Sequence, residues 1–201
     1  MMMRLGFVVL CVLTISSCVV DDGASQAVPG GSTSLPSNGP DKSVALPFDN
    51  LFPNRWNPSN DGTSYEPCVA FSQEELQRFG VDVKFVEDAA QVDGQGIRGC
   101  IWYMRDTYSL SIVVTNAESL SQYKSGTPEL DWKQDRLVNG RVVGLADLAY
   151  DDATCTTYIQ SGRAIVATDV TISSAKEARD RYDPCKIVLD FTAAYIDKIP
   201  E

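Results

Sequence analysis

Alternation of apolar and polar residues dominates the chain after residue 80 and predicts an antiparallel sheet. Residues 99–104 and 108–114 lie on either side of a short polar connection, which predicts one hairpin. Residues 155–159 and 163–170, joined across Ser161-Gly162, predict another. Further strands are expected at residues 81–88 and 141–145.

Apolar residues at helical spacing occur on both sides of this region. A first helix is expected over residues 65–80, because Ser72 and Glu75 have capping-box spacing and Gly80 follows the last apolar residue. A last helix is expected from Pro184-Cys185 to the end of the chain, since proline suits the first helical turn. Between them, residues 117–123 predict a short helix, and residues 124–139 a loop or a weak helix.

Together these elements predict an α+β fold, in which an antiparallel sheet of hairpins carries helices packed on one face. Residues 63–201 have the length of one domain and are expected to form a single α+β domain. Trp102 is expected in its core, and Tyr103, the next residue on the same strand, on the other face of the sheet.

The pattern changes at the N-terminus, where residues 5–15 form an apolar stretch behind one basic residue, Arg4. Its length of about 11 residues fits a signal peptide and falls short of the ~20 that span a bilayer as a helix. Small residues directly before Cys18 are what bacterial lipoprotein processing requires. Residues 1–17 are therefore expected to be a lipoprotein signal peptide and Cys18 the lipidated first residue. The alternative is an ordinary secretory signal that leaves Cys18 as a chance thiol.

Residues 18–46 are rich in Ser, Gly, Pro and Asn and are expected to be a lipidated flexible tether. Residues 47–62 are expected to be an extended aromatic lead-in to the domain. The lead-in carries four large apolar side chains, Phe48, Leu51, Phe52 and Trp56. Either these side chains pin the lead-in onto the domain, or they form an exposed patch, with Phe52 and Trp56 as the candidate partner-binding residues.

Four cysteines remain after the leader and Cys18: Cys68, Cys100, Cys155 and Cys185. An even number of well-spaced cysteines in an exported chain favours two disulfides. A zinc site of four thiolates is the rival interpretation, but such sites use closely spaced cysteine pairs, which this chain lacks. Pro67-Cys68 and Pro184-Cys185 each begin a helix, and Cys100 and Cys155 each begin a strand. Pairing each helix start with a strand start favours disulfides between Cys68 and Cys100 and between Cys155 and Cys185. Three connectivities stay open, and a bridge from Cys68 to Cys185 would refute this choice.

Charge and composition exclude several classes of function. Residues 1–17 contain one of the 17 basic residues, Arg4, and none of the 27 acidic ones, so the exported chain is strongly acidic and repels nucleic acid. The chain has no histidine, which removes the usual general base of hydrolases and the commonest metal ligand. We expect no catalytic residue, no metal site and no cofactor.

Several acidic and glycine-rich groups could carry chemistry but are interpreted as structural. Asp147, Asp151 and Asp152 lack the ligand alternation of a calcium loop. The carboxylate pairs Glu74–Glu75 and Asp131–Asp135 are expected on the surface. Residues 93–99 precede no helix, so a hairpin or bulge accounts for their glycines.

The motifs taken in order resemble a known family. Pro67-Cys68 opens a helix, Cys100-x-Trp102 opens a strand, and Asp183-Pro184-Cys185 opens the last helix. The series is similar to that of actinobacterial envelope lipoproteins with a cysteine-defined domain of unknown function. The resemblance implies two disulfides, no established activity and no catalytic residue to carry over.

We therefore expect an extracytoplasmic protein held at the cell membrane through lipid on Cys18. Its leading function is that of a non-catalytic binding or accessory module whose partner is an envelope protein or a small ligand. The alternative is a cell-wall glycan hydrolase that uses only Asp and Glu.

Overall fold

The computed structural model describes residues 44–148 and 151–201, without the side chain of residue 151. The expected signal peptide over residues 1–17, the expected lipidation site Cys18 and the expected tether up to residue 43 lie outside the described residues. So do Ala149 and Tyr150.

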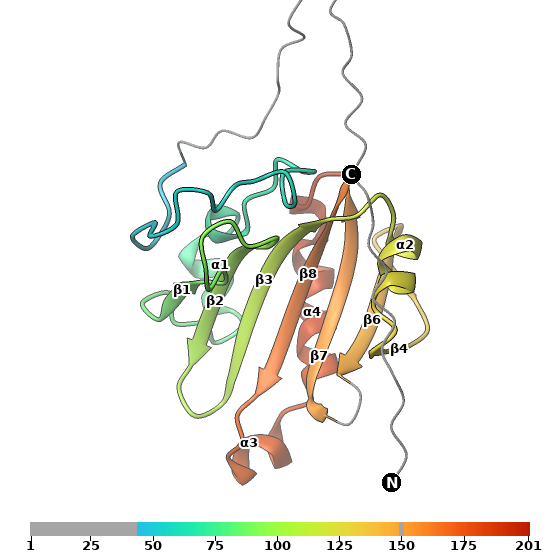
Figure 1. The fold of residues 1–201 in the computed structure, drawn as a ribbon. Coiled ribbons are helices and arrows are strands. Elements are labelled where there is room, and N and C mark those ends of the chain that lie inside the picture. The colour runs from blue at the N-terminus through green and yellow to red at the C-terminus, as the bar shows by residue number, and fades with distance from the viewer. Residues whose placement is uncertain (1–43, 149–150) are drawn as a thin grey trace, which may run out of the picture. The chain divides into compact units, whose positions relative to one another are not determined.

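An antiparallel sheet organises the described chain (Figure 1). Its strands are β1 (Val86–Asp88), β2 (Arg98–Met104), β3 (Tyr108–Asn116), β4 (Leu130–Trp132), β5 (Arg136–Val138), β6 (Arg141–Leu148), β7 (Asp151–Ser161) and β8 (Ala164–Ile172). Among the described residues the strand order is β1-β2-β3-β8-β7-β6-β4, with β5 also paired to β6. Both predicted hairpins, β2–β3 and β7–β8, are present, and they lie side by side because β3 pairs with β8.

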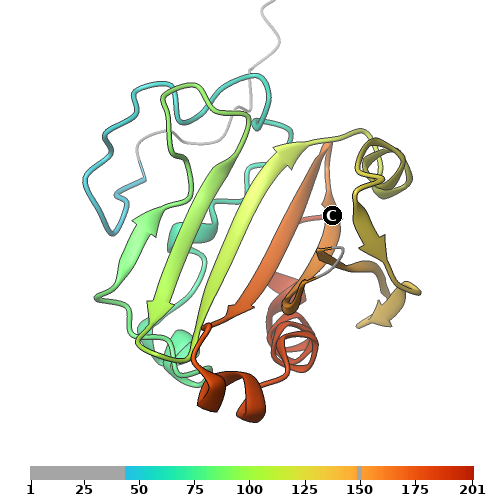
Figure 2. The same ribbon diagram turned by 60° about the horizontal axis from the view of Figure 1, so that its bottom comes forward.

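Four α-helices and two short 3-10 helices accompany the sheet in this part of the chain. They are η1 (Pro67–Val69), α1 (Gln73–Gln77), α2 (Leu120–Gly126), α3 (Lys176–Arg181), α4 (Pro184–Tyr195) and η2 (Ile196–Lys198). Helix α4 crosses one face of the sheet along β7 and β8 (Figures 1 and 2). The expected α+β fold with an antiparallel sheet is confirmed.

Helix α4 begins as predicted, because Asp183 accepts a hydrogen bond from the Lys186 backbone amide and Pro184 occupies the first turn. Its buried residues Val188, Phe191 and Tyr195 follow helical spacing and face the sheet. Trp102 is buried on the same side of the sheet, and Tyr103 lies on the other face, as predicted, where it is exposed. One continuous core therefore lies between α4 and the strands.

A second, smaller core lies on the opposite face, near β6 and β7. Trp132 packs against Tyr158 with ring centres 4.7 Å apart, and Tyr123 of α2 packs against Tyr158 at 5.4 Å. Leu120 and Leu130 also pack in this cluster. The segment from α2 to β4 thus covers part of the face that α4 leaves open.

Both disulfides form as favoured from the sequence. Cys68 of η1 joins Cys100 of β2, and Cys155 of β7 joins Cys185 of α4. Each bridge fixes the start of a helix to a strand of the sheet.

Three predicted elements differ in the structure. The single helix over residues 65–80 is divided into η1 and α1, because the capping box of Ser72 and Glu75 starts a new helix there. Only Val86–Asp88 of the expected strand 81–88 pairs with a neighbour. The loop or weak helix expected over residues 124–139 contains β4 and β5, and α2 extends to Gly126.

Candidate binding site

The lead-in, residues 47–62, lies against the end of the sheet formed by β1 and β2. Hydrogen bonds hold it there. Asn54 donates to both carboxylate oxygens of Asp93, from its backbone amide at 2.7 Å and from its side-chain amide at 2.8 Å. Asn57 donates to the carbonyl oxygen of Gln95 at 2.8 Å. Gly94, between Asp93 and Gln95, has a φ of 73°, a conformation that glycine adopts readily. The turn predicted at residues 93–96 therefore forms and presents these two acceptors to the lead-in.

A groove of about 420 Å³ lies between the lead-in and β1. We call it the β1 groove. Its lining residues are Phe48, Asp49, Leu51 and Phe52 from the lead-in and Val86, Glu87, Asp88, Ala90 and Gln91 from β1 and the chain after it. The volume is within the range of small-ligand and side-chain pockets.

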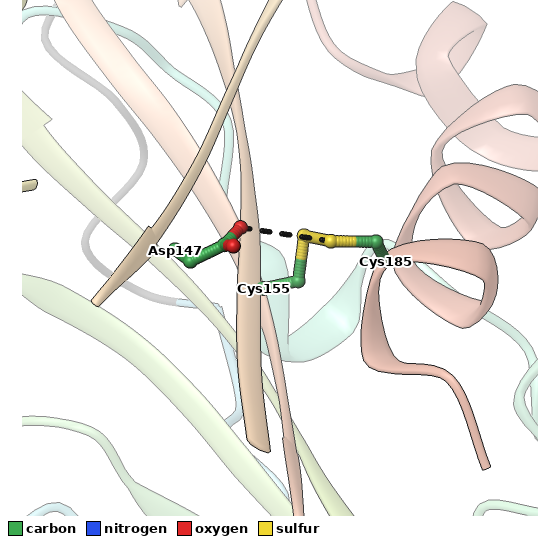
Figure 3. Close-up of side chains that lie close together, drawn as sticks. All are labelled: Asp147, Cys155 and Cys185. Carbon is green, nitrogen blue, oxygen red and sulfur yellow. Dashed lines mark hydrogen bonds between the residues drawn. A yellow bond between two sulfur atoms is a disulfide. The ribbon is translucent and has the colours of Figure 1, made fainter. Parts of the chain in front are cut away.

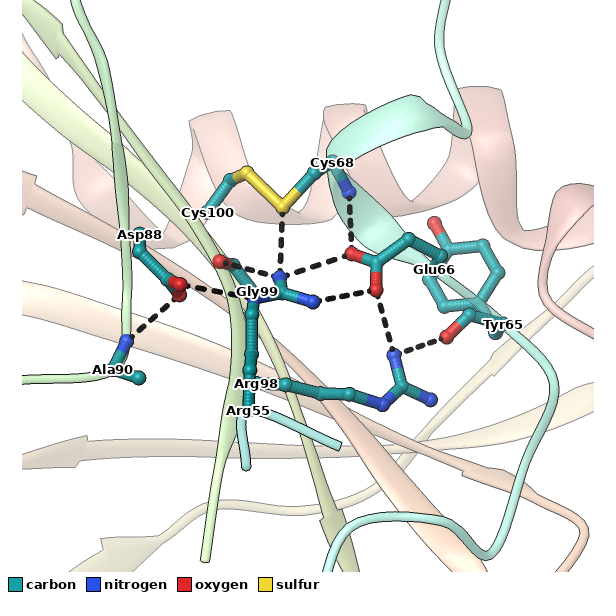
Figure 4. The surroundings of a disulfide bond; sticks show 9 residues. All are labelled: Arg55, Tyr65, Glu66, Cys68, Asp88, Ala90, Arg98, Gly99 and Cys100. Atoms are coloured by element: carbon teal, nitrogen blue, oxygen red, sulfur yellow. Dashed lines mark hydrogen bonds and ion pairs between the residues drawn. A yellow bond between two sulfur atoms is a disulfide. The ribbon is translucent and has the colours of Figure 1, made fainter. Parts of the chain in front are cut away.

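Two buried arginines fix the lead-in behind this groove (Figure 4). Arg55 is 1% exposed; it donates to both carboxylate oxygens of Glu66, at 2.8 and 3.1 Å, and to Asp88 at 3.0 Å. It also donates to the carbonyl oxygen of Gly99 and to the sulfur of Cys68. Burial lowers the pKa of Arg55, but the hydrogen bonds and charges of Glu66 and Asp88 outweigh it and raise that pKa overall.

Arg98, at the start of β2, is fully buried. Its guanidinium donates to the carbonyl oxygens of Asn60, Thr63 and Tyr65, at 3.1, 2.9 and 2.6 Å. Burial lowers its pKa to about 10, with the charge of Glu66 opposing that effect. Arg98 therefore holds the chain that connects the lead-in to the first disulfide.

Arg55, Glu66, Asp88 and Arg98 form what we call the arginine cluster. Two cations and two carboxylates balance in formal charge, and Glu66 contacts both arginines. Buried ion pairs of this kind are tolerated only when hydrogen bonds satisfy the remaining donors, as the backbone carbonyls do here. The cluster is thus a rigid support for the groove wall.

The structure separates the two residues proposed from the sequence for partner binding. Phe52 lines the β1 groove, whereas the ring of Trp56 lies against the guanidinium of Arg98. Trp56 therefore pins the lead-in onto the domain, as one interpretation expected, and partner binding by Phe52 stays a prediction. Leu51 is 77% exposed in the groove wall, and Phe48 packs against the core.

The sequence analysis missed the arginine cluster. A signal for Arg98 was present, because Arg98, Cys100 and Trp102 alternate in phase and so share the inward face of β2. Nothing comparable marks Arg55 in the irregular lead-in.

Among the residues that the structure describes, one group of three side chains has the composition of a metal site (Figure 3). The ligand atoms of Asp147, Cys155 and Cys185 lie within 4.8 Å of one another. The two sulfurs are joined in a disulfide, so neither is a thiolate that could bind a metal ion.

The acidic residues that the sequence offers as candidate carboxylate pairs lie on the surface of the described chain or near it. Asp131 pairs with Lys133, Asp135 with Lys124, and Glu75 with Lys198. The expected acidic loop is instead the end of β6 and the start of β7, where Asp152 pairs with Arg179 at 3.1 Å. The side chain of Asp151 lies outside the described residues.

Among the helices of residues 44–148 and 151–201, none combines the length and the apolar composition that a membrane span needs.

Comparisons with known proteins identify a family. Searches of curated proteins and of solved structures found no match to the chain. A family model described as "Protein of unknown function (DUF3558)" matches residues 13–198. Because that match spans most of the chain, including the four disulfide-bonded cysteines, the arginine cluster and the groove, the chain belongs to the DUF3558 family of proteins of unknown function.

Proposed function

We propose that this protein is a cell-envelope lipoprotein of the actinobacterial kind that acts outside the cytoplasm as a non-catalytic binding module. Its membrane attachment is lipid on Cys18, and its binding site is the β1 groove. The apolar stretch and small residues before Cys18 support the first part. The two disulfides support an oxidising location, because such bonds persist outside the cytoplasm.

The observation that carries the binding role is the groove itself. Leu51 is held 77% exposed beside Phe48 and Phe52, in a wall fixed by buried charges. Exposed apolar side chains are normally scattered, whereas a groove lined by several of them marks an interaction site. A wall that is rigid before binding loses little conformational entropy when a partner arrives.

The distribution of exposed apolar residues supports the same location. Four of the nine large apolar side chains that are exposed in the described chain lie on the lead-in or around β1 and β2: Leu51, Phe85, Val92 and Tyr103. We expect a partner to cover several of them.

Photo-crosslinking in the cells that naturally make the protein tests the binding role. A photoreactive residue at Leu51 is expected to give one specific adduct, and the same residue at Leu137, which is 75% exposed on β5, is the matched control. Identical adducts from both positions, or none from Leu51, would refute a binding role for the groove.

Mass spectrometry of the native protein tests the attachment. The N-terminal peptide is expected to begin at Cys18 and to carry acyl chains, and Cys18→Ala is expected to release the protein from the membrane fraction. An unmodified Cys18 in the native protein would refute the lipid anchor.

A further inference from the structure

Strand β1 is one edge of the sheet, and its backbone has one unpaired side. Phe85 accepts a hydrogen bond from Tyr103 of β2, and Ala89 donates one to Gly99, at 2.9 and 3.1 Å. Since alternate residues of an antiparallel strand direct their backbone groups to opposite sides, those of Val86 and Asp88 point away from β2.

That outer side faces the β1 groove, whose lining includes Val86 and Asp88. In the described part of the chain β1 pairs with β2 alone, and none of the backbone hydrogen bonds outside the strand ladders involves Val86 or Asp88. An exposed edge with free N–H and C=O groups is a template for another extended chain.

The charged residues that line the groove indicate what kind of extended chain would bind there. Its lining contains three carboxylates, Asp49, Glu87 and Asp88, and no basic residue. Asp88 is neutralised by Arg55, but no salt bridge of the described residues includes Asp49 or Glu87. Glu87 is exposed and neighbours the Tyr103 hydroxyl, whose pKa is raised by burial and by that carboxylate. Two acidic side chains therefore remain available to a cation.

We propose that the β1 groove binds an extended, basic segment of a partner protein, which pairs with β1 as an additional strand. An apolar side chain of that segment lies among Phe48, Leu51 and Phe52, and a Lys or Arg lies beside Asp49 and Glu87. The inference rests on the binding role proposed above for the same groove. Anionic lipid and nucleic acid are disfavoured occupants because the same carboxylates repel them.

Peptide binding to the full exported chain carrying Cys18→Ser tests this inference. The probe is a hexapeptide of alternating lysine and valine with blocked ends, because this pattern puts cations on one face and apolar side chains on the other. Its counterpart has glutamate for lysine. A third peptide is N-methylated at alternate residues, which removes the amides that would pair with β1.

The lysine peptide is expected to shift the NMR signals of Val86, Glu87 and Asp88 and to slow the hydrogen exchange of the outward amides about tenfold. Glu87→Lys and Asp49→Lys are each expected to weaken its binding by about tenfold, whereas Glu129→Lys, a charge reversal after α2, should leave it unchanged. The N-methylated peptide should bind at least about tenfold more weakly.

Equal binding of the glutamate and lysine peptides would overturn the charge assignment, and with it the proposal. Full binding of the N-methylated peptide, or shifts outside β1 and the lead-in, would overturn strand pairing. If Leu51 forms a specific crosslink in cells but no lysine peptide perturbs β1, the binding role stands and this inference fails. If Leu51 forms none, the binding role itself fails.

Discussion

The guanidinium carbon of Arg98 lies 3.4 Å from the centre of the Trp56 ring. This contact joins the aromatic lead-in to the first residue of β2. It also shields the guanidinium of Arg98, which is fully buried, from water. Cation–π contacts are strongest when the cation is desolvated, as it is here. Trp56 is therefore a structural residue, and Phe52 and Leu51 are left to form the groove.

Trp56→Ala is expected to lower the free energy of unfolding by about 2 kcal/mol, because the contact with Arg98 and the apolar area of the ring are both lost. Urea denaturation followed by circular dichroism measures this change. Leu51→Ala is the control, and its exposed side chain should change stability by less than about 0.5 kcal/mol. Equal effects of the two variants would contradict the assignment.

Glu66→Gln is expected to cost about 3 kcal/mol of stability, because two buried guanidinium groups lose the carboxylate that they share. Glu87→Gln, on the exposed side of β1, is the matched control and should be nearly neutral. The comparison is made by chemical denaturation at neutral pH. A small effect of Glu66→Gln would mean that the backbone carbonyls alone support the arginines.

Gly99→Ala is expected to prevent folding or to destabilise the protein severely. A Cβ atom at this position would lie 2.0 Å from the carbonyl oxygen of Ile112, and that backbone cannot move without breaking the pairing of β2 with β3. Gly126→Ala at the end of α2 is the control, since a Cβ there meets no atom within 4 Å. We expect soluble Gly126→Ala and little or no soluble Gly99→Ala. Normal thermal unfolding of Gly99→Ala would contradict the close approach.

Asp169→Asn is expected to alter stability in a pH-dependent way. Burial raises the pKa of Asp169, and hydrogen bonds from Thr156 and Thr171 offset this in part. Between the ordinary value of about 3.9 and the raised value, the folded protein keeps a proton that the unfolded chain has lost, so stability falls as pH rises.

The gain from Asp169→Asn should therefore be largest at neutral pH and should shrink below about pH 3.9. Urea denaturation of both proteins at several pH values measures it, with Asp180→Asn on the exposed surface of α3 as control. A difference between Asp169→Asn and the parent that does not vary with pH would contradict the raised pKa.

Removal of either disulfide by paired Cys→Ser substitution is expected to lower the free energy of unfolding by about 3 to 4 kcal/mol. The reason is that each bridge restricts the unfolded chain by closing a loop, over sequence separations of 32 and 30 residues. Peptide mapping under non-reducing conditions should recover Cys68 with Cys100 and Cys155 with Cys185. A peptide that joins Cys68 to Cys185 would contradict the structure.

Much of the sheet was predictable because its hairpins are long enough for alternation to be visible. The β7–β8 turn also has the expected glycine, since Gly162 has a φ of 56°. Helix α4 was predictable from Asp183-Pro184 and the apolar spacing that follows.

The elements missed by the sequence analysis lack such signals. Strands β4 and β5 are three residues each, which is too short for a period of two to be recognised. Helix α3 buries only Ala178, so no apolar stripe marks it. Long-range interactions define these elements. Strands β4 and β5 depend on pairing with β6, and α3 depends on contact with the rest of the fold.

The candidate site was predicted only in part, through Phe52. Its support depends on arginines, which are almost never fully buried, so a reading of the sequence assigns them to the surface. Their burial follows from long-range partners such as Glu66 and Gly99, and single-sequence periodicity carries no information on those contacts.

Under the proposed anchoring at Cys18, the bonds from Arg98 to the carbonyl oxygens of Asn60, Thr63 and Tyr65 also determine which proteolytic cut would leave the β1 groove intact. A cut ahead of Val44 would release residues 44–201 with every one of these bonds kept, so the freed form would carry an intact groove. A cut between Trp56 and Asn60 would detach the indole and Arg55 together and leave Glu66 and Arg98 open to water. Under the proposed anchoring and binding role, release from the membrane and loss of the groove would be separated by about a dozen residues of backbone.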